Sequence, residues 1–239
     1  MTTTQITGRQ IREPSINYGE MYMYGNVTPC VIDVVDVYHA VYNTFGNNDL
    51  ILPPVIDTAA FTFKAGVGYV IASVANYNAP TSTQIKVTIT AGHALLAGEP
   101  VTLTGTTNYD GTYLVLAAGL TATEFVVTKT YVATRTGSAR RPATLKCLVA
   151  GKYLVGFSIS GTPANPNDNF KWELNKSDVA LDNIGARSVW SSATKYESAS
   201  AQGLVSLTAG QYVWLSVKNY SGTGDLTFHS AEVFLHRLI

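Results

Sequence analysis

Two segments in the C-terminal half of the chain are the clearest strands in the sequence. Residues 151–159 and 210–219 both begin with glycine, are rich in aromatic and β-branched side chains, and end in turn-forming residues. Side chains of these types predict strands. An asparagine-containing segment at 172–176 and an alternating segment at 226–238 accompany them. Together, the four segments predict an antiparallel sandwich.

Between about residues 80 and 142 the pattern changes, because threonine becomes very frequent. Apolar and polar residues alternate cleanly over four short runs, at 85–89, 100–104, 112–116 and 124–128. Turn-forming residues separate these runs, at the spacing expected of a small β-barrel. Segments of linker composition, 78–82 and 136–142, bracket the module. We therefore predict a barrel at residues 81–142, inserted into a host domain formed by residues 18–80 and 143–239.

The N-terminal part of the host domain is less regular. Residues 21–24 predict a short strand, and two more strands are expected at 60–64 and 68–74. Residues 30–42 place Val31, Val35, Tyr38 and Tyr42 on one helical face. Their many β-branched and aromatic side chains nevertheless favour a strand, which we predict.

Residues 1–17 form a polar arm that contains Arg9, Ile11 and Arg12. The arm has too little apolar surface to fold alone. It is therefore either a disordered tail or a strap that docks on a neighbour. The arm lacks the pattern of a signal peptide, so we expect no export. No run of eighteen apolar residues occurs, so we expect no membrane span.

Composition narrows the choice of partners. Hydrophobic residues make up 46% of the chain and charged residues only 13%, and the 16 basic and 16 acidic residues give a formal net charge of +0. Such a chain has no long-range electrostatic field to attract the phosphates of nucleic acid, so we expect no nucleic-acid binding. Its weak self-repulsion suits a permanent assembly. Cys30 and Cys147 both have apolar neighbours, so we expect buried free thiols rather than a disulfide.

Candidate chemistry is sparse. Residues 156–160 lack the final glycine of a nucleophile elbow, and the four histidines have no metal-ligand spacing. Residues 165–169 could offer oxygen ligands to calcium, but an ordinary loop is the better reading. Arg135, Arg140 and Arg141 are either a grip for a carboxylate or a solvated linker. We therefore expect no catalytic residues, no metal and no cofactor, and a protein that is not an enzyme.

The host domain resembles the jelly roll of the tumour-necrosis-factor superfamily, also found as the globular head of complement proteins. The resemblance lies in residues 150–160, 172–176, 207–217 and 226–238, with Gln211 where that family usually has aspartate. It implies an all-β jelly-roll sandwich, interrupted by the inserted barrel and preceded by an extended arm. It also implies heads that associate as threefold trimers through one sheet.

The inserted module resembles a small β-barrel that recurs in bacteriophage structural proteins. The resemblance covers residues 93–105, 108–113 and 123–127, with Ala94 and Glu99 in place of the usual glycine and aspartate. Residues 18–26 also resemble the start of many phage virion proteins. The combination implies a virion protein.

Tyr212 and Trp214 share one face of their strand, and the residues between and after them share the other. One row therefore fills the sandwich, and a partner subunit is the natural cover for the other. We predict that Tyr153, Phe157, Tyr212 and Trp214 belong to the core or to a trimer interface.

These observations predict a non-enzymatic, trimeric capsid-decoration or head-fibre protein on the surface of a phage particle. Its arm would dock on the major capsid protein or another virion protein. The alternative is a receptor-binding tip whose loops, at 162–170 and 182–196, touch a host surface polysaccharide.

Overall fold

A computed structural model describes residues 18–24, 30, 32, 35, 39–40, 61–177 and 179–238. These residues form β-strands joined by turns and loops, and every strand pairing among them is antiparallel. Within the same part of the chain, no helix is long and apolar enough to cross a membrane. The predicted all-β, antiparallel fold is confirmed.

The first sandwich sheet has four strands in the order β1-β16-β11-β14. Its strands are β1 (Tyr18–Tyr24), β11 (Gly151–Pro163), β14 (Glu197–Leu207) and β16 (Leu226–Arg237). The N-terminal β1 pairs along its whole length with the C-terminal β16. Strand β1 precedes the inserted barrel in the sequence and β16 follows it, so this sheet joins the two parts of the host domain.

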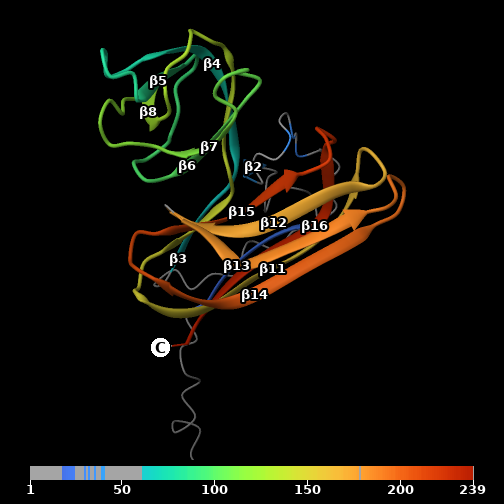
Figure 1. The fold of residues 1–239 in the computed structure, drawn as a ribbon. Helices are drawn as coiled ribbons and strands as arrows, with labels where there is room; N and C mark the ends of the chain where they lie inside the picture. The colour runs from blue at the N-terminus through green and yellow to red at the C-terminus, as the bar shows by residue number, and fades with distance from the viewer. Residues whose placement is uncertain are drawn as a thin grey trace, which may run out of the picture.

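The second sandwich sheet follows the order β13-β12-β15-β10-β3, and β2 pairs with β15 beside this path. Its strands are β2 (His39–Ala40), β3 (Phe61–Lys64), β10 (Thr144–Cys147), β12 (Asp168–Lys176), β13 (Val179–Trp190) and β15 (Tyr212–Asn219). Figure 1 shows the two sheets lying face to face, with the inserted module beside them and the C-terminus on the far side.

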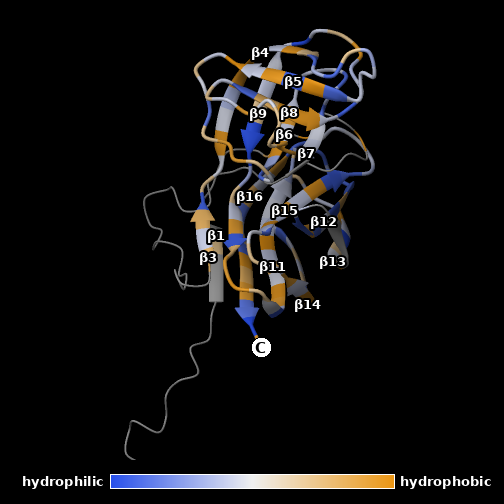
Figure 2. Cartoon of the chain, turned by 90° about the vertical axis from the view of Figure 1, so that its left-hand side faces the viewer, coloured by the Kyte–Doolittle hydropathy of each residue, from blue (hydrophilic) through white to orange (hydrophobic). Residues whose placement is uncertain are grey.

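The sandwich core contains the inward side chains of both sheets. Alternate residues of β11, from Tyr153 to Ile159, are at most 1% exposed. Phe170, Trp172 and Trp190 face them as an aromatic cluster, and the two tryptophan ring centroids lie 5.0 Å apart. Figure 2 shows bands of higher and lower hydropathy following one another along β11 and β16. Aromatic pairs at this separation add to the stabilisation from burial.

The inserted module is a six-stranded sheet in the order β7-β6-β9-β4-β5-β8. Its strands are β4 (Val67–Asn76), β5 (Gln84–Ile89), β6 (Pro100–Thr104), β7 (Gly111–Leu114), β8 (Glu124–Thr128) and β9 (Gly137–Arg141). The sheet nearly closes on itself, because the amide of Leu116 donates to the carbonyl of Val126 at 2.8 Å. It has its own hydrophobic core. The four predicted barrel strands are present.

Both predicted linkers of the barrel were wrong. Residues 137–141 form β9, which pairs with β4 on one side and β6 on the other and buries Ala139. Residues 78–82 belong to the loop of the β4–β5 hairpin, where Asn78 accepts from the amide of Gln84 at 2.9 Å. The barrel sheet therefore starts at Val67, before the predicted boundary at 81, and β4 belongs to it rather than to the host.

The predicted single strand at residues 30–42 was also wrong, because Val35 lies in a turn and is 45% exposed. Cys30 makes an isolated bridge with Leu226 beside the first sandwich sheet, whereas β2 pairs with β15 in the second. One straight strand cannot pair in both sheets, so Cys30 and β2 do not belong to a single strand. The arm, with Arg9, Ile11 and Arg12, lies outside the described residues.

Candidate functional site

The outward face of the first sandwich sheet carries exposed apolar side chains. Leu204 on β14 is 63% exposed, and it pairs in register with Leu154 on β11. Phe234 on β16 lies beside them and is partly exposed, and its register partner on β11 is Gly156. A Cβ atom at residue 156 would lie 2.6 Å from Cζ of Phe234, so only glycine lets this ring lie across the sheet. We call Leu154, Leu204 and Phe234 the apolar face.

Beyond the apolar face, the same sheet presents hydroxyl groups. Ser158, Ser160, Ser200 and Ser230 occupy neighbouring positions in the register, and the hydroxyl oxygens of Ser160 and Ser230 lie 2.6 Å apart. This face therefore has small hydroxyl side chains toward one end and the apolar face toward the other. Acidic residues lie among them, because Glu232 is the register partner of Ser158 and Glu20 that of Phe234. A flat surface of mixed apolar and polar side chains is of the kind found at protein–protein contacts.

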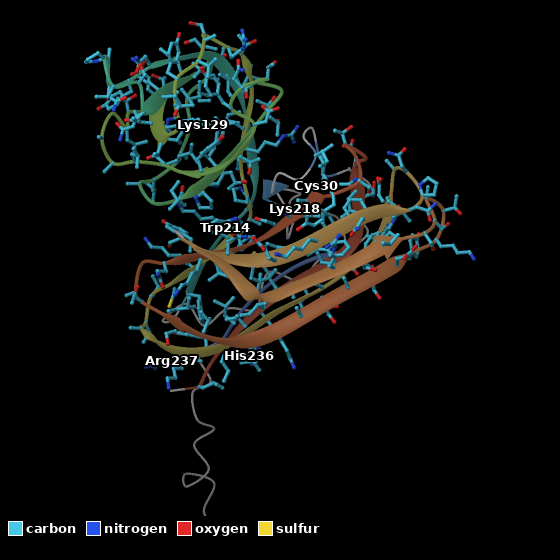
Figure 3. The ribbon with its side chains drawn as sticks, in the orientation of Figure 1. Cys30, Lys129, Trp214, Lys218, His236 and Arg237 are labelled. Atoms are coloured by element: carbon cyan, nitrogen blue, oxygen red, sulfur yellow. The ribbon has the colours of Figure 1, made fainter. Side chains whose placement is uncertain are left out.

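The second candidate region is the junction between sandwich and barrel. Tyr212 and Trp214 are buried there and pack against Leu114 of β7 (Figure 3 labels Trp214). Val213, Leu215 and Val217 point to the opposite side, into the sandwich core. The predicted separation into two rows is confirmed, but the predicted cover was wrong: the barrel of the same chain, rather than a partner subunit, buries Tyr212 and Trp214.

A buried carboxylate connects the two modules at the junction. Glu99, directly before β6, is 0% exposed and forms an ion pair with Lys64 of β3. Its other oxygen accepts from the amide of Leu96 at 2.9 Å. Burial, together with the negative charge of Glu99 and a hydrogen bond to it, raises the pKa of Tyr212 to about 12. At neutral pH the Tyr212 hydroxyl group therefore stays protonated and donates a hydrogen bond to Glu99.

Arg141 fixes the place where the chain enters and leaves the barrel. Its guanidinium donates to the carbonyl of Ala65 at 3.1 and 3.3 Å and to the carbonyl of Ala94 at 3.4 Å. The two chain segments that join the sandwich to the barrel therefore run side by side. Before the first segment and after the second, Lys64 pairs with Thr144, and on the barrel side Val67 pairs with Arg141. Arg141 is buried and belongs to the fold, and Arg135 donates to Asn108 at 2.8 Å. Arg140 and Arg141 are successive residues of β9, so they belong to a strand rather than a solvated linker, and their side chains point to opposite faces of the sheet.

Loops at one end of the sandwich bring a second set of polar residues together. Tyr196, which is 71% exposed, contacts His229, with ring centroids 4.2 Å apart and ring planes tilted by 50°. Thr162 lies 3.3 Å from Nε2 of that histidine. The carboxylate of Glu197 accepts from the amides of Ser191 and Ser192, which fixes the loop before Tyr196.

The remaining candidate residues show no joint site. Ser158, the serine of the segment compared with a nucleophile elbow, lies within β11 rather than at a turn, and its side chain is exposed. Asp168, in the loop weighed as a calcium site, is buried and accepts from Ser221 at 3.3 Å. In the part of the chain that the structure describes, no three His, Cys, Asp or Glu side chains are placed to hold a metal ion. The predicted free, buried thiols of Cys30 and Cys147 are confirmed.

Of the residues predicted for a core or an interface, Tyr153 and Phe157 lie in the sandwich core. The hydroxyl of Tyr153 donates to the carbonyl of Val149. Sequence reasoning missed the role of Glu99, although an isolated acidic residue in an apolar strand-forming segment was the available signal. It also did not single out Leu154, Leu204 and Phe234, because their proximity depends on the strand register.

Comparison with known proteins adds little. No protein-family model matches the chain, and no curated protein matches it. Among solved structures, the chain is similar to the tumour-necrosis-factor protein Eiger from S. frugiperda. The match has 19% sequence identity and a TM-score of 0.32, and covers 72% of this chain and 94% of that one. At this level the likeness carries no argument about function, and the fold rests on the strands and pairings described above.

Proposed function

We propose that this chain is a non-enzymatic structural protein of a bacteriophage particle, of the capsid-decoration or head-fibre type. It assembles as a homotrimer, docks through residues 1–17 on the major capsid protein or another virion protein, and displays the sandwich and barrel on the particle surface. The sequence resemblances of both modules to virion proteins and to trimeric heads support the proposal. The observation that carries the assembly is the apolar face of the first sandwich sheet.

The proposed trimer is supported by the apolar surface that the single chain leaves uncovered. The barrel covers Tyr212 and Trp214, whereas Leu204 remains 63% exposed beside Leu154. Burying this face against further copies of the chain would remove apolar surface from water, at about 25 cal/mol per Å². A closed ring of three copies satisfies such a contact without open-ended growth. Three linked arms would then bind the particle with the strength of multivalency.

The test is to mix purified protein separately with mature capsids that lack it and with host cells, and to measure co-sedimentation in each. Binding to capsids alone is the expected result. Failure to bind any capsid of the phage that encodes it would contradict the proposal.

A truncated chain that starts at Tyr18 separates the role of the arm from that of the head. Strand β1 begins at Tyr18, so the truncation leaves the paired part of the first sandwich sheet intact. We expect a folded trimer that no longer co-sediments with capsids. Normal co-sedimentation of the truncated chain would rule out the arm as the docking element.

The second candidate function is receptor binding by a tail or fibre tip. Tyr196 favours it, since an exposed aromatic ring held against His229 is a platform on which a sugar ring can stack. If this function holds, wild-type protein binds host cells, host polysaccharide competes, and Tyr196→Ala weakens the binding. Leu238→Ala is the matched control, since it removes another exposed apolar side chain away from these loops.

A further inference from the structure

Three basic residues from three neighbouring strands lie side by side in the second sandwich sheet. Lys171 on β12 is the register partner of Arg187 on β13 and of Lys218 on β15. Adjacent strands are about 4.8 Å apart, so the row spans about 10 Å. The three positions are far apart in sequence, and only the strand register brings them together. We call Lys171, Arg187 and Lys218 the basic row.

The basic row points away from the sandwich core. The residues next to it along the strands, Trp172 and Val217, are buried in that core, and successive side chains alternate between faces. Nζ of Lys218 lies 4.3 Å and Cζ of Arg187 lies 4.5 Å from the ring centroid of Tyr220. The basic row and Tyr220 therefore share the outward face, where Figure 3 labels Lys218.

The basic row places like charges directly opposite each other, which destabilises a sheet. Among the described residues that flank the row in register, Glu173 supplies the single carboxylate, 3.1 Å from Nζ of Lys171. Arg187 donates through Nε to the neutral side chain of Asn169 at 3.1 Å and is itself exposed. The chain as a whole has no net charge, so this concentration of positive charge is local.

We propose that the basic row binds an acidic polysaccharide, with the carboxylates of uronic-acid residues placed along it. The guanidinium of Arg187 can grip one carboxylate through two parallel hydrogen bonds, and the two ammonium groups can receive others. Asn169 adds polar hydrogen-bonding atoms next to the row. The repulsion that the row costs the free protein is relieved when the polyanion binds.

A polysaccharide fits this surface better than an acidic peptide does. A peptide commonly adds as a strand at an open sheet edge or inserts an apolar anchor into a pocket. Strands β12 and β15 lie in the interior of their sheet, whereas Arg187 lies on the edge strand β13. Two of the three basic side chains therefore lie away from the sheet edge, and the row runs across the strands rather than along the edge, which matches a chain of acidic sugars laid over the face better than an added peptide strand.

The test measures binding of purified full-length protein to alginate at low and at physiological ionic strength. Dextran serves as the neutral control polymer and polyglutamate as the acidic peptide. We expect binding to alginate that weakens with salt, none to dextran, and a loss of about tenfold in affinity for Arg187→Gln or Lys218→Gln. Lys152→Gln, which removes an exposed charge from the first sandwich sheet, should bind like the wild type.

The melting temperature separates a binding role from a structural one. Each variant relieves like-charge repulsion but loses a cation–π contact with Tyr220, so both should melt close to the wild-type temperature. No alginate binding by the wild type, equal binding by the row variants and Lys152→Gln, or tighter binding to polyglutamate would each overturn the proposal. The inference rests on neither the trimer nor the virion assignment, so capsid binding can succeed or fail independently of it.

Discussion

The ammonium group of Lys64, on β3 of the sandwich, forms an ion pair with the carboxylate of Glu99, in the barrel. Glu99 is fully buried, whereas the Lys64 side chain is 28% exposed. The pair joins the two modules beside the connections that Arg141 holds together. The barrel is therefore fixed to the sandwich by polar contacts as well as by the packing of Trp214 against Leu114.

Lys64→Met should lower the free energy of unfolding by about 3 kcal/mol, because it leaves the buried carboxylate of Glu99 without its cation. Denaturant unfolding measures the change. Lys86→Met is the matched control, since Lys86 pairs with Glu124 at 2.9 Å between side chains that are 33% and 30% exposed. The control should cost about 0.5 kcal/mol. Equal losses in the two variants would contradict the role of the buried pair.

Tyr212 should make the protein less stable at alkaline pH. Its pKa is about 12 in the folded state and 10 ordinarily, so between these values the folded protein keeps a proton that the unfolded chain releases. The free energy of unfolding is therefore unaffected below pH 10 and falls as the pH rises toward 12. Denaturant unfolding across this range measures the decline.

Tyr212→Phe should show a smaller alkaline decline than the wild type. The decline should not vanish, because burial also raises the pKa of Tyr113 to about 12 and raises the pKa of Tyr153. Tyr196→Phe, at a side chain that is 71% exposed, is the control. An alkaline decline in Tyr212→Phe as steep as that of the wild type would show that Tyr212 does not contribute.

Gly156→Ala should destabilise the fold by about 2 kcal/mol, because the new methyl group has no room. It would lie 2.6 Å from Cζ of Phe234 and 2.8 Å from the carbonyl oxygen of Ala201, and the latter belongs to a paired strand. Gly68→Ala is the control, since no atom lies within 4 Å of a Cβ atom there. Thermal melting compares the two, and a loss in the control as large as in Gly156→Ala would contradict the steric account.

The sequence predicted the strands well where one face of a strand is buried. The segment around Tyr153 alternates with the period of a half-buried strand and lies in the sandwich core. The segment around Val213 is buried on both faces, and its aromatic and β-branched side chains identified it as a strand. The prediction failed at β9, because its Gly, Ser and Arg residues resemble a linker and only pairing on both sides makes it a strand. It failed at residues 30–42 because the crossing between sheets is a long-range constraint.

The surfaces were harder to predict than the strands, for a physical reason. Tyr212 and Trp214 were correctly placed on a second face, but the sequence does not state which module covers that face. The apolar face and the basic row each unite residues from three strands, and their proximity depends on register. A pattern along one strand carries no information about its neighbours.

The molar mass of the full-length protein in solution tests the central claim most directly. Light scattering at micromolar concentration should give three times the 25.6 kDa mass of the chain for the wild type. Leu204→Glu, which places a charge in the apolar face, should give a folded monomer. Val189→Glu, at a residue 54% exposed on the other sheet, should remain trimeric. A wild type that is monomeric at this concentration, or a Leu204→Glu variant that stays trimeric, would contradict the account.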